Sequence, residues 1–282
     1  MTMWTLSLGY SPCPNDTFLF YPLVHGLIDT GELLFRERLE DVETLNRLAL
    51  DNIPDVCKVS YHAFAYIREH YVLLRSGGAM GRGCGPLVVA RQGHHMGDLK
   101  GKRFATPGSY TTAHLLLRLF DKEIGHIVTM PFHEIMPAVV QGQVDAGVII
   151  HESRFTFQHF GLRKILDLGQ WWECRTGLPL PLGGIAAKRS LGDPLLRKLD
   201  SLVRSSVEYA TGHPDEARKY IRAHAREMAD DVCSSHIRLY VNQHSLDPGS
   251  DGERAAAALL SAGSAHGLLP DSNLPVFISR RP

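Results

Sequence analysis

A histidine follows one of the longest apolar runs of the sequence. Residues 144–150 read Val-Asp-Ala-Gly-Val-Ile-Ile, which is typical of a buried strand, and His151 comes directly after them. Ligands of open α/β sheets bind beyond the carboxyl ends of the strands, so this side chain is expected to face a crevice. Imidazole can accept a proton near neutral pH, which makes His151 a candidate general base. A loop histidine in solvent is the alternative. Glu152, Ser153 and Arg154 could orient the imidazole or pair with a substrate.

Two threonines lie where another predicted strand gives way to a helix. Residues 107–112 read Pro-Gly-Ser-Tyr-Thr-Thr, and an apolar helix begins near their end. A helix N-terminus presents free N–H groups and the positive end of the helix dipole. Thr111 and Thr112 are therefore candidates for holding a carboxylate or a phosphate without any Lys or Arg. The alternative is that Thr111 or Ser109 only caps the helix.

A third strand-to-helix junction lies near the start of the chain. Residues 11–17 read Ser-Pro-Cys-Pro-Asn-Asp-Thr and offer a second edge for an anion or a hydroxyl group. Cys13 is a possible nucleophile, but prolines flank it and no histidine is adjacent, so a structural role is favoured. Asn46 and Ser60 could supply neutral hydrogen bonds to a polyol, although each alone is more often a surface or capping residue.

The sequence motifs of common cofactors do not occur. The glycine-rich stretch at 80–85 lacks the Gly-Lys-Ser/Thr ending of a phosphate loop and does not match the dinucleotide fingerprint, so no nucleotide cofactor is expected. The five cysteines are scattered and form no Cys-x-x-Cys pair. The fifteen histidines show no His-Glu-x-x-His spacing, and His94 and His95 lie in a polar stretch typical of a loop. We expect reduced thiols, no disulfide and no metal.

The elements that must position these residues alternate between strand and helix patterns, which is the signature of an α/β fold. Asn15 or Asp16 is expected to cap a helix that runs toward His25, and Asp41 to open another. Strands are expected at 4–10, 56–60, 71–74, 87–90, 144–150 and 185–187, and residues 98–108 are expected to form a turn, a strand and a Pro-Gly loop in that order. Further helices are expected at 61–70, 111–120 and 135–141, and in a helical tail at 193–210, 214–224, 231–240 and 253–266.

Two stretches rich in Gly and Pro divide this pattern into lobes. The first, at 77–85, contains five glycines, and the second, at 179–184, reads Pro-Leu-Pro-Leu-Gly-Gly. Glycine permits sharp turns and close backbone approach, so both stretches suit hinges. We expect a smaller lobe over 92–181 and a larger, discontinuous lobe over 1–91 and 182–282, with a cleft between them. Trp171 and Trp172 are expected at the lobe interface or in the cleft wall.

Composition narrows the class of partner. The chain has 282 residues, of which 44% are hydrophobic and 21% charged, enough for one large core or two medium ones. Thirty Lys and Arg balance thirty Asp and Glu without any basic block, which argues against nucleic-acid binding. No apolar run approaches the roughly 20 residues of a membrane span, and the N-terminal residues carry no secretory pattern. We expect a cytoplasmic protein with a small-molecule or protein partner.

Seven short stretches follow one another in an order that is familiar from one enzyme family. They are Ser-Pro-Cys-Pro-Asn-Asp-Thr-Phe (11–18), Glu-Asp-Val-Glu-Thr-Leu-Asn (40–46), Lys-Val-Ser-Tyr (58–61), Gly-Pro-Leu-Val-Val (85–89), Thr-Thr-Ala (111–113), Ile-Ile-His-Glu-Ser-Arg-Phe (149–155) and Gly-Leu-Pro-Leu-Pro-Leu-Gly (177–183). The chain resembles the 1,4-dihydroxy-6-naphthoate synthase family of the futalosine route to menaquinone. The resemblance covers nearly the whole chain, and the combination is highly specific.

The resemblance implies a type-II periplasmic-binding-protein-like fold and a lyase reaction. In that reaction cyclic dehypoxanthinyl futalosine yields 1,4-dihydroxy-6-naphthoate and dihydroxyacetone. His151 would be the base. The residues implied to bind substrate are Lys58, Val59, Ser60, Thr111 and Thr112, with Asn15 and Asn46 carried over more loosely. The resemblance further implies a small carboxylate substrate and no cofactor, and we expect a monomer or a homodimer.

Two other functions compete with this interpretation. Chorismate dehydratase of the same pathway shares the fold, but the His-Glu-Ser-Arg stretch at 151–154 and the Ser-Pro-Cys-Pro-Asn-Asp opening favour the synthase. A non-catalytic solute-binding protein would be expected to begin with a signal peptide or a lipoprotein cysteine. Neither pattern occurs, although this alternative stays open if a signal once preceded the sequence.

Overall fold

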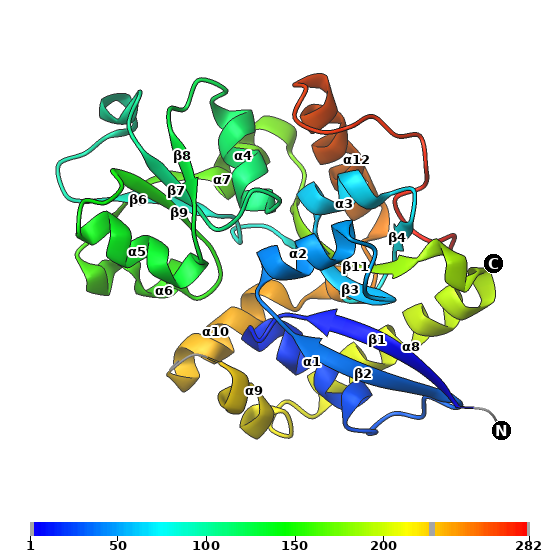
Figure 1. Ribbon diagram of the computed structural model, residues 1–282. Coiled ribbons are helices and arrows are strands. Elements are labelled where there is room, and N and C mark those ends of the chain that lie inside the picture. The colour runs from blue at the N-terminus through cyan, green and yellow to red at the C-terminus, as the bar shows by residue number, and fades with distance from the viewer. Residues whose placement is uncertain (1–2, 226–228, 281–282) are drawn as a thin grey trace.

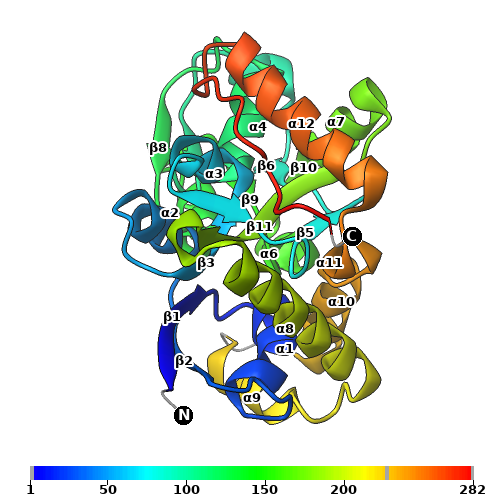
Figure 2. The same cartoon turned by 90° about the vertical axis from the view of Figure 1, so that its right-hand side faces the viewer.

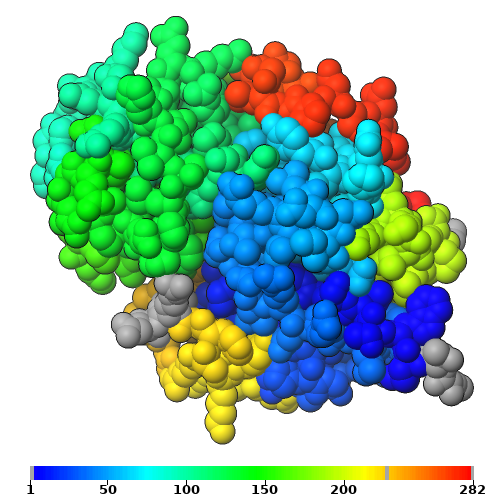
Figure 3. Space-filling model, in the orientation of Figure 1, coloured from blue at the N-terminus to red at the C-terminus, as the bar shows by residue number. Residues whose placement is uncertain are grey.

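The computed structural model describes residues 3–225 and 229–280, which form two β-sheets flanked by helices (Figure 1). The larger lobe holds the sheet that begins with the first strand of the chain, and the smaller lobe holds a sheet from the middle of the chain. Figure 3 shows the atoms of the smaller lobe, in green, lying directly against the blue atoms of the larger lobe. The expected α/β architecture with two sheets is confirmed.

The sheet of the larger lobe combines segments from distant parts of the chain. Its order is β2-β1-β3-β11-β4, and β5 pairs with β11 beside this path. β1 runs parallel to β2 and β3, whereas β11 is antiparallel to β3, β4 and β5. These strands are β1 (Trp4–Tyr10), β2 (Leu33–Leu39), β3 (Val56–Ser60), β4 (Tyr71–Leu73), β5 (Ala79–Gly81) and β11 (Leu180–Lys188).

The sheet of the smaller lobe has the order β10-β6-β9-β7-β8. β7 lies parallel to both β8 and β9, while β6 is antiparallel to β9 and β10. Central β6 and β9 are buried along their whole lengths, in keeping with their continuous apolar sequences. The strands are β6 (Leu87–Ala90), β7 (Phe104–Thr106), β8 (Ile127–Thr129), β9 (Ala146–Ile149) and β10 (Arg163–Asp167).

Helices cover both sheets. They are α1 (Pro14–Val24), α2 (Val42–Leu50), α3 (Tyr61–Ile67), α4 (Thr112–Phe120), α5 (Phe132–Val140), α6 (Ser153–Thr156), α7 (Leu168–Thr176), α8 (Asp193–Gly212), α9 (Arg218–His224), α10 (Asp230–Tyr240), α11 (Gln243–Leu246) and α12 (Gly249–Ala265). Short 3-10 turns occur at Met96–Leu99, Phe157–Phe160 and Arg189–Leu191. None of the helices in the described part of the chain combines the length and apolarity that a bilayer crossing requires.

One hydrophobic core runs through both lobes. Leu45 and Val59 of the larger lobe belong to the same buried cluster as Phe104, Leu116 and Val148 of the smaller lobe. α12 contacts α3 and β11 of the larger lobe and α4 of the smaller lobe, and Figure 2 shows it on the flank that the two lobes share. Burial of apolar surface is the dominant favourable contribution to folding, so this shared core holds the lobes together.

The chain enters the smaller sheet earlier in the sequence than the lobe boundary that we expected between residues 91 and 92. β6 lies on the larger-lobe side of that boundary but pairs with β9 and β10 in the smaller sheet. The other expected boundary, between residues 181 and 182, falls inside β11. We propose that the chain crosses between lobes near 82–86, and returns near 177–179.

Most of the predicted elements are present, and three expectations need correction. Asn15 and Asp16 do not cap α1; they lie in its first turn, after Pro14. The glycine-rich half of the second hinge stretch is the first part of β11, which begins at Leu180 and not at Ile185. The stretch around Trp171 forms α7, a helix that the sequence did not predict. Asp41 caps α2 as expected, because its carboxylate accepts from the N–H groups of Glu43 and Thr44.

Candidate active site

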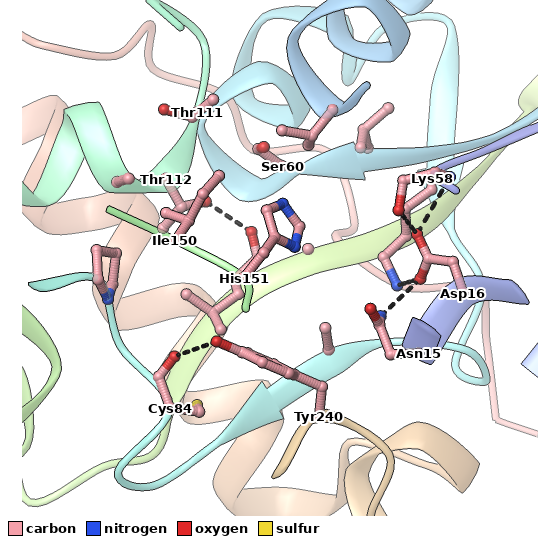
Figure 4. A pocket seen from close by; sticks show the side chains of 18 residues that line it. Asn15, Asp16, Lys58, Ser60, Cys84, Thr111, Thr112, Ile150, His151 and Tyr240 are labelled. Carbon is pink, nitrogen blue, oxygen red and sulfur yellow. Dashed lines mark hydrogen bonds and ion pairs between the residues drawn. The ribbon is translucent and has the colours of Figure 1, made fainter. Parts of the chain in front are cut away.

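A pocket lies between the two lobes (Figure 4). Its wall is formed where parallel strands of both sheets reach their carboxyl ends: β1 and β3 in the larger lobe, β7 and β9 in the smaller. This is the position at which ligands bind in α/β proteins. The lining residues are Ser11, Asn15, Asp16, Val42, Lys58, Val59, Ser60, Ala79, Cys84, Pro86, Thr111, Thr112, Ala113, Ile150, His151, Leu182, Gly183 and Tyr240.

His151 occupies the middle of this pocket wall. Figure 4 shows its ring between Ser60 on one side and Tyr240 on the other. Its backbone adopts φ 55°, a left-handed conformation that is uncommon for residues other than glycine. Such a conformation two residues beyond a buried strand turns the chain sharply, and it marks a place where the surrounding structure fixes one geometry.

The imidazole of His151 is suited to accept a proton. Burial lowers its pKa below the ordinary histidine value, and the nearby Lys58 ammonium lowers it further, while the carboxylates of Glu152, Asp16 and Asp41 act in the opposite direction. Because the net effect is a lowered pKa, the ring is neutral at neutral pH, which is the form that a general base requires.

Two rings flank His151. Phe132 approaches it with the ring centres 5.2 Å apart. His236 of α10 lies parallel to it, with ring centres 6.0 Å apart and 3° between the planes. The Nε2 of His236 is 2.9 Å from Oδ1 of Asn15, and burial lowers the pKa of His236 well below its usual value. Asn15 therefore accepts from Nε2–H, which leaves Nδ1 of His236 as a bare acceptor.

A buried ion pair joins α1 to β3. Lys58 Nζ lies 2.9 Å from Asp16 Oδ1, with the two side chains only 7% and 3% exposed. Asp16 also accepts from Ser11 Oγ at 2.7 Å and from Asn15 Nδ2 at 2.8 Å, and Lys58 donates to the Gly77 carbonyl. Each charge thus has more than one partner, which is the condition under which a buried pair is tolerated.

Asn46 forms hydrogen bonds to Ser60, a residue of the pocket wall. It is fully buried, accepts from the Ser60 N–H at 2.9 Å and donates to Ser60 Oγ at 3.1 Å. The same amide group donates to the Tyr110 carbonyl of the smaller lobe at 3.2 Å. Asn46 does not appear in the pocket wall, and its hydrogen bonds instead fix Ser60, which does.

The N-terminus of α4 faces the pocket. Thr111 is the N-cap residue, and its Oγ1 accepts from the His114 N–H at 3.2 Å and donates to the Gly108 carbonyl. The capping role is therefore confirmed, and Thr111 also lies in the pocket wall. Capping leaves the first-turn N–H groups of Thr112 and Ala113 for a ligand. Thr112 Oγ1 donates to the Leu182 carbonyl at 2.7 Å and retains a lone pair to accept with.

The residues whose roles the sequence left open are now placed. Burial raises the pKa of the Cys13 thiol well above its usual value, so the resting form is the thiol and not a nucleophilic thiolate. Arg154 donates to the carbonyls of Gly83 and Gly85 and thereby ties α6 to the first crossing between lobes. Trp172 is buried and donates to the Pro179 carbonyl.

The structure brings seven of the eight predicted site residues to one pocket, and Asn46 is the exception. Sequence reasoning missed Asp16 as the partner of Lys58, and it missed His236 and Tyr240. The last two are one turn apart on α10, so they face the same way. Tyr240 lines the pocket and donates to the Cys84 carbonyl at 3.2 Å. No motif signalled them, since they lie in a helical tail with ordinary amphipathic spacing.

Cys13, His151 and Glu152 are the only group in the described part of the chain whose donor atoms lie close enough to suggest a metal ion. Their ligand atoms are all within 4.8 Å of one another.

Comparison with known proteins places this chain among enzymes of quinone biosynthesis. A family model described as menaquinone biosynthesis matches residues 6–265. The chain is 53% identical over 277 residues to a 1,4-dihydroxy-6-naphthoate synthase of Thermus thermophilus, covering 98% of this chain and 100% of that protein. It is 47% identical over 275 residues to a protein of the same name from Streptomyces coelicolor, covering 96% of each chain.

Solved structures support the fold. A protein from Archaeoglobus fulgidus superposes with a TM-score of 0.89 at 36% identity, covering 94% of this chain and 98% of that one. A Candida albicans protein described as having the generic periplasmic-binding-protein fold superposes with a TM-score of 0.70 at 14% identity, covering 96% and 92%. The second likeness concerns the fold alone. The periplasmic-binding-protein-like fold expected from the sequence is confirmed.

Proposed function

The chain belongs to the menaquinone-biosynthesis family, and we propose from this that it is a 1,4-dihydroxy-6-naphthoate synthase. In this role it is a carbon–carbon lyase that converts cyclic dehypoxanthinyl futalosine to 1,4-dihydroxy-6-naphthoate and releases dihydroxyacetone. The observation that carries the assignment to this site is a neutral imidazole, His151, held at the wall of a pocket that is also lined by a helix N-terminus.

The proposed chemistry needs few protein groups. Loss of a three-carbon fragment with formation of an aromatic ring requires that a proton be removed and that the acid group be held. His151 takes the proton as general base. The N–H groups at the start of α4 hold the substrate carboxylate, with the Thr112 hydroxyl beside them. Aromatisation supplies driving force, so no redox step is needed and we propose a cofactor-independent reaction.

The lobes must stay closed for this geometry to hold. Glu43 of α2 accepts from the Tyr110 N–H at 3.1 Å, Asn46 donates to the Tyr110 carbonyl, and His62 of α3 bonds the Thr111 carbonyl at 3.1 Å. These three contacts join the larger lobe to the loop that carries the threonine pair. We infer that closure excludes water and sets His151 opposite Ser60.

We further propose that the protein acts in the cytoplasm on a small-molecule carboxylate, as a monomer or a homodimer, in line with its relatives' role in biosynthesis.

The experiment is turnover of cyclic dehypoxanthinyl futalosine by the purified chain without added metal or nucleotide, followed by mass spectrometry. We expect dihydroxynaphthoate and dihydroxyacetone in equal amounts. His151→Ala should lower turnover by about 10²–10⁴-fold, the usual contribution of a general base. His159→Ala serves as the control, because His159 is exposed in the 3-10 turn that follows α6.

Other results of these incubations would indicate one of the two alternative functions. Dehydration of chorismate in a parallel incubation would indicate chorismate dehydratase. Tight binding of the futalosine derivative with no product would indicate a solute-binding protein. Near-normal turnover by a folded His151→Ala variant would refute the role of the histidine while leaving the family assignment intact.

A further inference from the structure

Three metal-ligating side chains of different kinds meet at the edge of the active site. Cys13 precedes α1 in the larger lobe, whereas His151 and Glu152 follow β9 in the smaller lobe. One donor atom from each lies within 4.8 Å of the other two. Thiolate, imidazole and carboxylate are the three ligand types found in zinc sites, and three protein ligands with one open position is an arrangement that zinc commonly adopts.

The observed spacing is slightly wider than a bound ion requires. With metal–ligand distances of about 2.0–2.3 Å, the donors of a tetrahedral zinc ion lie roughly 3.3–3.6 Å apart. The three donor atoms would therefore have to approach one another by about 1.5 Å at most. Because Cys13 and His151 belong to different lobes, a small further closure of the cleft supplies this movement.

An unsatisfied acceptor points to the same place. Oε2 of Glu152 is buried and has no hydrogen-bond partner among the described residues. A buried carboxylate oxygen without a partner is costly, and a cation would satisfy it. The missing hydrogen bond of Glu152 and the close spacing of the three donor atoms are separate observations, and both concern the same site.

An ion could reach this position without passing through the substrate pocket. A second pocket includes Cys13 and Glu152 in its wall but not His151, while the substrate pocket includes His151 but neither of the others. The donors thus lie in the partition between two pockets. Asp41 also lines the second pocket, and its carboxylate favours the approach of a cation.

We propose that Cys13, His151 and Glu152 form an inhibitory site for a thiophilic divalent cation such as Zn²⁺, which joins the two lobes and occupies the catalytic base. Binding exchanges the thiol proton for the metal: the S–H bond breaks, a metal–sulfur bond forms and one proton leaves to solvent. The inhibitory part of the proposal rests on the proposed function, because it requires His151 to be the base. The binding part does not.

The test uses the full chain in a Cys174→Ser background, since Cys174 is exposed and would bind metal on its own. Co²⁺ is titrated first, because a cobalt–thiolate bond gives a charge-transfer absorption band. We expect one Co²⁺ per chain, this band, and displacement by Zn²⁺. Zn²⁺ should also inhibit turnover, with recovery on adding EDTA.

Variants assign the ligands. Cys13→Ala should abolish the cobalt–thiolate band and raise the half-inhibitory Zn²⁺ concentration by at least about 100-fold, and Glu152→Gln should raise it about 10–100-fold. Cys57→Ala is the matched control, because Cys57 is another buried thiol outside the cluster. Cys13→Ser is made alongside and should also lose the band, which covers the case in which the alanine variant fails to fold.

The outcomes separate the two proposals. A cobalt–thiolate band that persists in the folded Cys13 variants, or no band in the parent, overturns the metal site. Equal Zn²⁺ inhibition of the parent and of Cys13→Ala overturns it as well. A Cys13-dependent band in a chain that turns over no futalosine derivative supports the metal site while the proposed function fails.

Discussion

Two histidines face each other across the lobe interface, and they make the closed molecule sensitive to acid. His62 of α3 and His114 of α4 have ring centres 6.0 Å apart. Burial is the main cause that lowers the pKa of each to about 4. His114 adds to the effect on His62, against the opposing hydrogen bond to the Thr111 carbonyl, and Arg118 adds to the effect on His114. In the unfolded chain each would titrate near 6.5. Between these two values the unfolded chain binds more protons than the folded one, so stability is lost as pH falls from about 6.5 to about 4.

The magnitude follows from the two pKa values. With a folded pKa of about 4 and an unfolded pKa of about 6.5, lowering the pH from 7 to 5 removes about 1.8 kcal/mol of stability for each histidine, or about 3.6 kcal/mol for the pair. If both rings are protonated in the closed state, two charges 6.0 Å apart repel by about 3 kcal/mol at an effective dielectric constant of 20. The second proton is therefore resisted more strongly than the first.

The assay is the change in thermal midpoint between pH 7 and pH 5. For 282 residues the entropy of unfolding is about 0.6 kcal/mol per kelvin, so each histidine should contribute about 3 °C to the acid-induced decrease. His62→Phe should remove that share, whatever it does to absolute stability through the lost bond to the Thr111 carbonyl. His159→Phe, at an exposed position, serves as the control. An unchanged pH dependence in His62→Phe would refute the reasoning.

Two further predictions concern stability. Asp16→Ala should destabilise the chain by about 3–5 kcal/mol, because it leaves the buried Lys58 ammonium with one carbonyl partner; Lys58→Met should cost roughly half as much, since Asp16 keeps its other donors. Urea unfolding of both variants checks this, and the reverse order would contradict it. Gly85→Ala should cost about 1–3 kcal/mol, because its Cβ would lie 2.3 Å from Gly169 Cα. A Cβ at Gly97 would have no atom within 4 Å, so Gly97→Ala should change the free energy of unfolding by no more than about 0.5 kcal/mol.

The sequence predicted which candidate site residues follow strand ends, but it did not predict the hydrogen bonds and the ion pair that hold their neighbours. His151, Ser60 and the threonine pair could be located because apolar runs identify strands, and ligand sites follow strand ends. Asn15 and Asp16 were interpreted as helix caps because Asn and Asp favour that position locally. Asn15 is hydrogen-bonded to His236, which lies 221 residues away in the sequence, and Asp16 is paired with Lys58, which lies 42 residues away. Local propensity carries no information about partners at such separations.

The extent of β11 illustrates a different limit. Pro181, Gly183 and Gly184 are typical of a turn, so the strand was expected to begin only at Ile185. In the structure a Cβ at Gly183 would lie 2.9 Å from the Val59 carbonyl oxygen, so glycine is required there by the close approach of β3. Pro181 lies where β11 pairs with β5 across a register shift, a place where a strand tolerates proline. The composition correctly indicated close backbone approach, but it did not indicate that the strand already begins at Leu180.

The candidate site is divided between the two sheets, so we expect neither lobe to act alone. The larger lobe supplies the buried ion pair and Ser60, and the smaller lobe supplies His151 and the N-terminus of α4. Asn46 makes hydrogen bonds to both lobes and is itself fully buried outside the pocket wall. Asn46 therefore contributes to the candidate site through Ser60 and through the contact between the lobes.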